Sequence, residues 1–193
     1  MTTFRFRTPI DELEARKLTV GDDVYISGIM ITARDQAHRR ALNYFRTGKP
    51  TPISFEGGVV FHCEPIAVNE GLRWKIVAAG PTTSSRIEPY EAEFIEAFMP
   101  RMIIGKAGMG VKTAEAAKKF GALYCDFTGG AAVLASQKIR AVKGVEWYDL
   151  GMPEALWILE VEAFGPATVT IDSHGNNLMR LFSVQHRRGS PRS

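Results

Sequence analysis

The sequence predicts an α/β fold, in which short strands end in turns that lead directly into helices. The pattern of strand, turn and helix occurs at least four times, with turns at residues 32–35, 80–86, 105–110 and 126–130. The chain has 193 residues, of which 45% are hydrophobic and 23% charged, as in a globular protein with a sizeable core. Because no internal repeat or low-complexity linker divides the chain, we expect one domain.

The first half of the chain is predicted from runs of apolar residues and from turn signals. β-Branched and apolar residues indicate strands, and apolar residues at helical spacing, followed by Gly48 and Pro50, indicate a helix with a defined end. The expected order is a lead-in over 1–17, a strand over 24–32, a helix over 33–45, short strands with turns over 51–69 and a buried strand over 74–79.

The second half repeats the pattern and ends in strands. Gly165 and Pro166 are expected to interrupt the last apolar run, and the alternation of Trp157, Leu159 and Val161 is typical of a core strand. We expect helices over 90–99, 111–120 and 131–139, strands over 102–104, 122–127, 145–148, 156–164 and 167–171, and a loop over 172–177.

Charge and cysteine content indicate an intracellular protein with no general nucleic-acid surface. The formal net charge of +3 equals the contribution of Arg187, Arg188 and Arg192, which lie in a basic C-terminal tail over 181–193. The two cysteines, Cys63 and Cys125, are far apart and do not suggest a disulfide scaffold. Neither a signal peptide nor an apolar run long enough to span a membrane is visible, so we expect a cytoplasmic location.

The turn over 80–86 (GPTTSSR) is the central feature of the sequence. A turn that opens a helix presents backbone N–H groups at the positive end of that helix and can bind an anion. This turn also carries Thr82 and Arg86 within five residues, so it can hold a carboxylate and place a hydroxyl beside it. The alternative is a simple helix entry, with Ser85 as the capping residue and Arg86 in solvent.

Three of the four turns contain a fixed cation, namely Arg34, Arg86 or Lys106. Arginine can bind a carboxylate through two parallel hydrogen bonds, and lysine provides a compact charge. Taken singly, each is more often a surface residue. Because the ends of strands in an α/β fold gather ligands, the three together predict a site for a small substrate with two carboxylates.

Other candidate motifs are weak. Residues 105–110 are rich in glycine but lack the spacing of a phosphate-binding loop. The four histidines, His38, His62, His174 and His186, show no metal-ligand spacing, so we expect no metal site. We expect His38 to be a surface histidine, with a supporting role beside the site as the alternative.

Four segments together resemble the C-terminal half of the class I, iron–sulfur-dependent fumarases. The resemblance extends to the beta subunits of two-subunit fumarases and L-tartrate dehydratases and covers about 18–174, in a domain that we bound at 18–180. Its segments are Ser27–Gly28 with 32–38 (TARDQAH), 80–86 (GPTTSSR), 104–109 (IGKAGM) and 126–132 (DFTGGAA). One departure is Ala107, where the family usually has a second glycine.

The resemblance implies a swivelling β/β/α domain that docks on a separate alpha subunit. That subunit would carry a [4Fe–4S] cluster on three cysteines, with the fourth iron open to the substrate hydroxyl and carboxylate. By the matching motifs, Thr82 would be the catalytic base, and Arg34, Arg86 and Lys106 would hold the oxygens of the substrate. This chain would then be active only with its partner.

These roles suit the removal of water across a carbon–carbon bond next to a carboxylate. The reaction needs a base, cations for the developing charge and a Lewis acid on the leaving hydroxyl, and the sequence offers candidates for the first two. A threonine hydroxyl also needs nearby cations to stabilise its alkoxide. We therefore expect the beta subunit of a hydro-lyase that converts fumarate to L-malate. The alternatives are an L-tartrate dehydratase beta subunit and a non-catalytic module that binds small anions.

Overall fold

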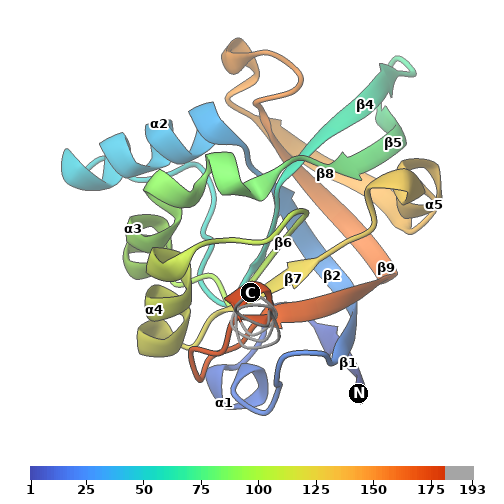
Figure 1. Ribbon diagram of the computed structural model, residues 1–193. Helices are drawn as coiled ribbons and strands as arrows, with labels where there is room; N and C mark the ends of the chain where they lie inside the picture. The colour runs from blue at the N-terminus through green and yellow to red at the C-terminus, as the bar shows by residue number, and fades with distance from the viewer. Residues whose placement is uncertain (181–193) are drawn as a thin grey trace, which may run out of the picture.

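A mixed sheet that closes on itself forms the centre of the molecule (Figure 1). The computed structural model of the chain describes residues 1–180, so the tail over 181–193 lies outside the described residues. The sheet has seven strands in the order β1-β2-β3-β6-β7-β9-β8. The neighbours from β1 to β7 in this order run parallel, whereas β9 is antiparallel to β7, β8 and β2. Because β9 pairs with both β7 and β2, the pairings form a ring. The strands are β1 (Thr3–Arg7), β2 (Asp23–Thr32), β3 (Val59–Phe61), β6 (Met102–Gly105), β7 (Leu123–Asp126), β8 (Ile139–Glu146) and β9 (Leu156–Ile171).

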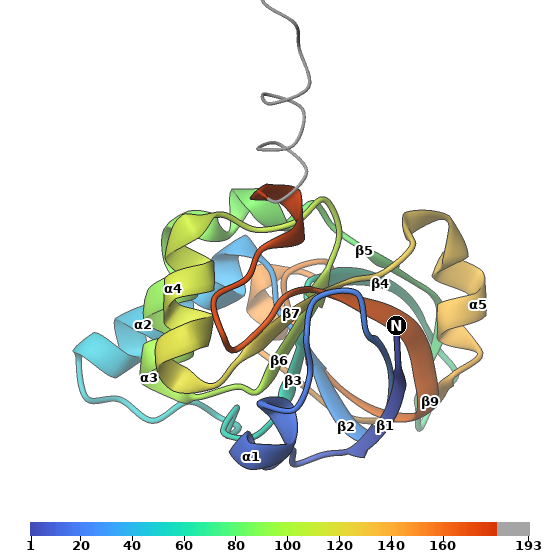
Figure 2. The ribbon, with the colours of Figure 1, turned by 60° about the horizontal axis from the view of Figure 1, so that its bottom comes forward.

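Three helices cover the outside of the parallel strands (Figures 1 and 2). They are α2 (Asp35–Arg46), α3 (Glu88–Phe98) and α4 (Val111–Phe120), and α3 lies between the other two. The short helical segments are α1 (Glu12–Ala15), η1 (Ser84–Arg86), η2 (Gly129–Ala131), α5 (Ala132–Ser136) and η3 (Tyr148–Leu150). None of the helices within residues 1–180 has the length and apolar character needed to cross a membrane.

The apolar strands are buried on both faces, which explains their continuous hydrophobic runs. Val59 and Phe61 point into the interior of the ring, whereas Val60 between them packs against α2 and α3. The interior also contains Trp157, Leu159 and Val161, which confirms their prediction as core residues. Alternation along each strand therefore builds one core inside the ring and a second layer under the helices.

A second, two-stranded antiparallel sheet projects from the ring at the upper right of Figure 1. It consists of β4 (Cys63–Asn69) and β5 (Trp74–Pro81). The sequence predicted a buried strand over 74–79, and this is wrong in part because the positions of β5 alternate between buried and exposed. A strand that packs on the core with only one face shows this alternation.

The C-terminal half differs from the prediction at two places. The strands predicted over 156–164 and 167–171 are one strand, β9, because a register shift against β2 absorbs Gly165 and Pro166 as a bulge. The helix predicted over 131–139 ends at Ser136, because pairing of β8 with β9 starts at Ile139. In addition, the segment expected as a lead-in over 1–17 contributes β1 to the main sheet.

Candidate active site

The four predicted turns lie at one end of the closed sheet, which is the edge formed by the carboxyl ends of the parallel strands. Backbone hydrogen bonds join the ends of the parallel strands at this edge. The Ala33 N–H donates to the Phe61 carbonyl (3.0 Å), and the His62 N–H donates to the Ile104 carbonyl (2.8 Å). The Phe127 N–H donates to the Gly105 carbonyl (2.7 Å). The strands β2, β3, β6 and β7 therefore end side by side, and the turns that follow them are neighbours in space.

The central turn joins this edge although β5 belongs to the other sheet. The Thr82 N–H donates to the His62 carbonyl at 2.7 Å, and the Ser84 N–H donates to the Lys106 carbonyl at 3.0 Å. Thr83 also forms an isolated parallel bridge with Lys106. These bonds fix the turn over 80–86 against the ends of β3 and β6.

Gly105 allows the close approach of this turn. A side-chain carbon at position 105 would lie 1.8 Å from Ser84 Oγ and 2.9 Å from the Tyr124 hydroxyl. Such distances are far below contact, so any larger residue would displace the turn that carries Thr82. The glycine at the end of β6 is thus explained by packing.

Thr82 and Arg86 are in direct contact. Arg86 Nη2 donates to Thr82 Oγ1 at 3.2 Å and lies 3.3 Å from Asp35 Oδ2, which belongs to the neighbouring turn. The Arg86 side chain is about half exposed, at 51%, so part of the guanidinium is open to a ligand. Ser85 is not a helix cap, because it lies inside η1 and neither η1 nor α3 begins with a side-chain cap bond. The helix-entry alternative is therefore wrong for Ser85.

Arg34 precedes α2 and is held by two carboxylates. It forms ion pairs with Glu64 at the start of β4 and, through Nε at 3.5 Å, with Glu154. Its side chain is 12% exposed, whereas Glu64 is 56% exposed. A ligand carboxylate can therefore reach Arg34 by replacing the exposed Glu64 rather than the more enclosed Glu154.

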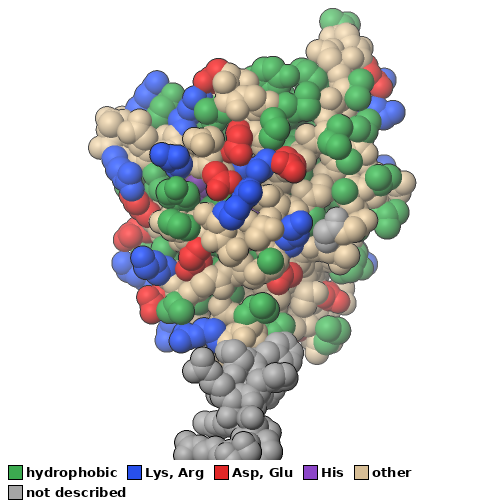
Figure 3. All heavy atoms as spheres, turned by 45° about the horizontal axis from the view of Figure 1, so that its top comes forward, with side chains coloured by type: hydrophobic (Ala, Val, Ile, Leu, Met, Phe, Trp, Pro, Cys, Tyr) green, Lys and Arg blue, Asp and Glu red, His purple; other side chains and the backbone are tan. Residues whose placement is uncertain are grey.

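Lys106 lies next to the central turn and has no carboxylate partner within residues 1–180. The structure thus places Thr82 and Arg86 in direct contact. Lys106 is next to them because its backbone pairs with that of Thr83. Arg34 precedes Asp35, whose carboxylate accepts a hydrogen bond from Arg86. Direct contacts from Arg34 or Lys106 to Thr82 are absent among the described residues. Figure 3 shows basic and acidic side chains close together on the upper face of the molecule, which carries this end of the sheet.

Ala107, which departs from the family pattern, keeps a left-handed backbone with φ of 67°. This conformation costs an alanine about 1–2 kcal/mol, and glycine adopts it freely. We expect Ala107→Gly to raise the unfolding free energy by about 0.5–1 kcal/mol, after the greater entropy of glycine in the unfolded chain is subtracted. Urea denaturation of both proteins measures this change, and a loss of stability would show that Ala107 is not strained.

A buried group of three titratable side chains lies beneath the turns, and sequence reasoning missed it. His38, His62 and Glu91 all have side chains that are 0% exposed. The prediction that His38 is a surface residue is wrong. A signal was present, because His38 shares the apolar face of its helix with Ala41 and Leu42. His62 has no local signal, because it stands alone between two strands.

The charges in this group are set by burial and by mutual contact. Burial lowers the pKa of His38 below its ordinary value. Burial alone would raise the pKa of Glu91, but the neighbouring His62 and His38 outweigh it and the pKa is lowered. The direction of this shift favours the carboxylate form of Glu91, with His62 as the larger favourable cause.

Within residues 1–180, the side chains of this group are of types that bind metal ions and lie close enough together to do so. One ligand atom from each of His38, His62 and Glu91 lies within 4.8 Å of the others. Two imidazoles and a carboxylate match the ligands of zinc. The alternative is a metal-free ionic cluster.

The cysteines do not fit an iron–sulfur cluster. Cys63 and Cys125 are buried, and burial raises the pKa of both thiols. Two enclosed, protonated thiols cannot supply the thiolates that a cluster requires. We expect neither thiol to react with a disulfide reagent at pH 8 in the native protein, and both to react after unfolding in guanidinium. Rapid reaction of the folded chain would contradict their burial.

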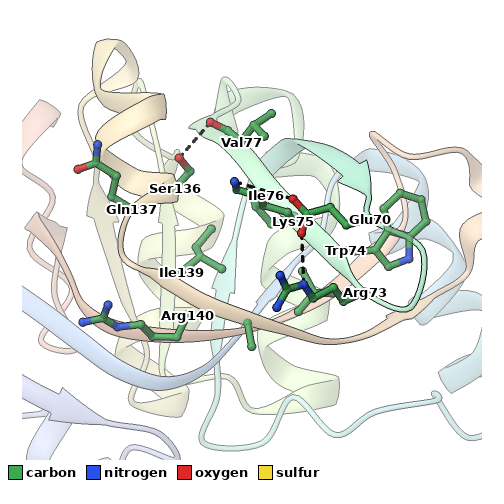
Figure 4. A pocket seen from close by; sticks show the side chains of 12 residues that line it. Glu70, Arg73, Trp74, Lys75, Ile76, Val77, Ser136, Gln137, Ile139 and Arg140 are labelled. Carbon is green, nitrogen blue, oxygen red and sulfur yellow. Dashed lines mark hydrogen bonds and ion pairs between the residues drawn. The ribbon is translucent and has the colours of Figure 1, made fainter.

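A cavity of about 630 Å³ lies between the far end of the β4–β5 hairpin and β8 (Figure 4). It is lined at one side by Trp74 and Lys75 and at the other by Gln137 and Arg140. Thr82 lies at the opposite end of β5, so this cavity contains none of the four predicted site residues. The candidate site therefore lies outside this cavity, at the end of the closed sheet where the four turns are neighbours.

Comparison with known proteins identifies the family of this α/β domain. The profile described as "Fumarase C-terminus" matches residues 3–182, and the chain belongs to this family. It is 44% identical over 172 residues to the L(+)-tartrate dehydratase subunit beta of Escherichia coli strain K12, a match covering 89% of this chain and 84% of that protein. It is also 42% identical over 173 residues to a Geobacillus stearothermophilus protein provisionally named fumarate hydratase class I, covering 89% of this chain and 32% of that longer protein.

Proposed function

We propose that this chain is the beta subunit of a hydro-lyase that acts on a four-carbon dicarboxylate, hydrating fumarate to L-malate in the reversible reaction. The observation that carries the proposal is the contact between the Thr82 hydroxyl and Arg86 at a strand end that also holds Arg34 and Lys106. The relatives named for tartrate dehydratase support a second candidate substrate, L-tartrate. L-Malate and L-tartrate differ by one hydroxyl, and no described residue distinguishes them.

In the dehydration direction, Thr82 Oγ1 as an alkoxide takes the proton from the carbon next to a substrate carboxylate and becomes a hydroxyl. The electron pair of the broken C–H bond forms the double bond, and the hydroxyl on the neighbouring carbon leaves with the electron pair of its C–O bond as hydroxide, which takes up a proton to become water. Arg86 favours the alkoxide because its Nη2 donates to Thr82 Oγ1. Each cation also lowers the cost of the negative charge that develops on the carboxylate. In the hydration direction, Thr82 returns the proton to carbon.

Arg86 and Lys106 are accessible to a ligand, whereas Arg34 is largely buried and paired with Glu64. Arg86 and Lys106 stand beside Thr82 and would hold the carboxylate next to the reacting carbon. Arg34 would hold the distal carboxylate once that group replaces Glu64. This exchange substitutes one charge-assisted bond for another, so its net cost is small. The expected result is a substrate fixed at both ends.

We also propose a partner subunit that carries the [4Fe–4S] cluster, since Cys63 and Cys125 do not fit one. The cluster would supply the Lewis acid for the leaving hydroxyl. Exposed apolar side chains support a docking surface on the hairpin and on α5, namely Ile66, Val68, Leu72, Val133 and Leu134. A groove of about 370 Å³ between them is lined by Glu64, Gly80 and Pro81, so this surface continues to the site. We place the complex in the cytoplasm and propose that the domain swivels on its partner.

The decisive experiment is anaerobic reconstitution with an alpha subunit produced from the same organism. We expect the purified beta chain to be colourless and inactive, and the complex to form L-malate from fumarate or oxaloacetate from L-tartrate. Activity of the beta chain alone after treatment with iron and sulfide would reject the need for a partner. If no alpha subunit binds while the chain binds small dicarboxylates, the chain is an anion-binding module instead.

A further inference from the structure

The buried side chains of His38, His62 and Glu91, which we call the buried triad, come from three elements. His38 is on α2, Glu91 is on α3, and His62 lies between β3 and β4. Glu91 Oε2 lies 3.0 Å from His62 Nε2 and 3.6 Å from His38 Nε2, and neither contact has the geometry of a hydrogen bond. The carboxylate is therefore held between two imidazoles in an enclosed space.

The other nitrogen of each imidazole reaches a turn of the candidate site. His38 Nδ1 donates to the Arg34 carbonyl at 2.8 Å, because a carbonyl can only accept. His62 Nδ1 lies 2.9 Å from Ser84 Oγ, and the His62 carbonyl accepts the Thr82 N–H. One imidazole thus holds the turn of Arg34, and the other holds the turn of Thr82.

A second glutamate of α3 holds the third cationic turn. Glu88 accepts hydrogen bonds from the Gly110 N–H and from the Thr113 hydroxyl, each at 2.6 Å. Gly110 is the last residue of the turn of Lys106, and Thr113 lies in α4 directly after it. Since Glu88 and Glu91 are one helical turn apart on α3, this helix is linked to all three cationic turns, and its link to the turn of Arg34 runs through His38.

We propose that the buried triad is a positioning unit, in which Glu91 sets the spacing between Arg34 and Thr82 through His38 and His62. This inference rests on the proposed function, because it concerns the same substrate site. A buried charged cluster adds little net stability compared with apolar residues of the same size. Precise spacing of substrate-holding groups has a larger effect, since a displacement of about 1 Å can reduce catalysis about 100-fold. The bonds from the triad to both turns are what such a role requires.

A divalent metal is the competing explanation for the triad. A metal site needs a path by which the hydrated ion enters. All three side chains are fully enclosed, with no exposed ligand atom. The Nδ1 atoms of both rings are bonded to Arg34 and Ser84, an arrangement that fits either explanation because a metal-bound histidine is also held through its second nitrogen. The positioning role rests on the bonds from the two rings to the two turns, and the metal content of the purified chain separates the explanations.

The test compares Glu91→Gln with two controls on the same helix, assayed in the reconstituted complex. Glu96→Gln removes an exposed ion pair with Lys119, and Ile95→Val removes a buried methylene from the core. We expect Glu91→Gln to lower kcat/KM by about tenfold or more, and both controls to stay within about threefold. Crystal structures of the isolated chain should show a changed Arg34–Thr82 spacing in Glu91→Gln only.

Three results would overturn the inference. One is a folded Glu91→Gln protein with unchanged kcat/KM and spacing, and another is Ile95→Val with the same loss of activity at equal stability. The third is one equivalent of tightly bound metal by mass spectrometry, which would make the triad a metal centre. If Glu91→Gln does not fold, Ser84→Ala replaces it, with an expected loss of about fivefold. If the wild-type complex is inactive, the proposed function fails, and the crystallographic spacing alone decides the inference.

Discussion

Replacement of Thr82 by alanine should nearly abolish turnover in the assembled enzyme. Loss of a general base typically costs about 10²–10⁴-fold in rate, and Thr82 Oγ1 is the atom that would remove the proton. Stability should change by less than about 1.5 kcal/mol, because the partly exposed side chain is lost with a single hydrogen bond to Arg86. Binding of substrate should persist, since the three cations remain. Thr82→Ser should keep part of the activity, because an unbranched hydroxyl is held less firmly.

The matched control is Thr83→Ala, one residue along the same turn. Thr83 is also partly buried and pairs with Lys106 through its backbone, so its hydroxyl is dispensable for the fold of the turn. The measurements are kcat and the exchange of solvent deuterium into malate. A fall in kcat of less than about tenfold, or roughly 1.4 kcal/mol, would show that Thr82 is not the base. Normal exchange in Thr82→Ala would lead to the same conclusion, and the base would then belong to the partner.

Arg86→Lys should reduce kcat/KM by an order of magnitude or more. A lysine keeps the positive charge but cannot bridge Asp35, Thr82 and a carboxylate with one planar group. Loss of one charge-assisted hydrogen bond costs about 1.5–3 kcal/mol, which corresponds to this reduction. The pH dependence of kcat should also shift upward, because a weaker contact at Thr82 Oγ1 raises the pKa of the hydroxyl.

Arg46→Lys provides the comparison for this substitution. Arg46 makes an exposed ion pair with Glu93 at the far end of α2, and such pairs contribute about 0–1 kcal/mol. The kcat/KM of Arg46→Lys should therefore equal that of the wild type. Equal activity in Arg86→Lys would remove Arg86 from the site and leave Lys106 as the cation next to Thr82.

The sequence predicted the parallel strands β2, β6 and β7 and their helices well because these elements are determined locally, whereas β1 was missed. Residues 24–32 and 102–104 are largely apolar, Gly48 follows the end of α2, and Gly110 precedes the start of α4. The continuity of β9 through Pro166 could not be predicted, because it depends on pairing with β2, which is distant in sequence. The start of β8 could not be predicted for the same reason, because it is set by pairing with β9.

The candidate site was predictable only for residues that stand in turns with a recognisable pattern. Thr82, Arg34, Arg86 and Lys106 were found from their turns, and their catalytic roles stay predictions. His62 and Glu91 were missed because a lone histidine and a helix glutamate carry no local sign of burial. The fold alone brings them within contact of each other.

The β4–β5 hairpin has an evolutionary consequence. It enters between β3 and α3, which would otherwise form a direct strand-to-helix connection like those after β2 and β6. The residue proposed as the base thus lies where the chain returns from the hairpin to the scaffold. Among the described residues, the two-stranded sheet makes no strand pairing with the ring. Lineages can therefore lengthen, shorten or resurface the hairpin to suit a new partner without disturbing the register of the ring. In the proposed complex, selection on assembly would act on the exposed face of the hairpin and selection on the scaffold on its buried face, which belongs to the core of the ring.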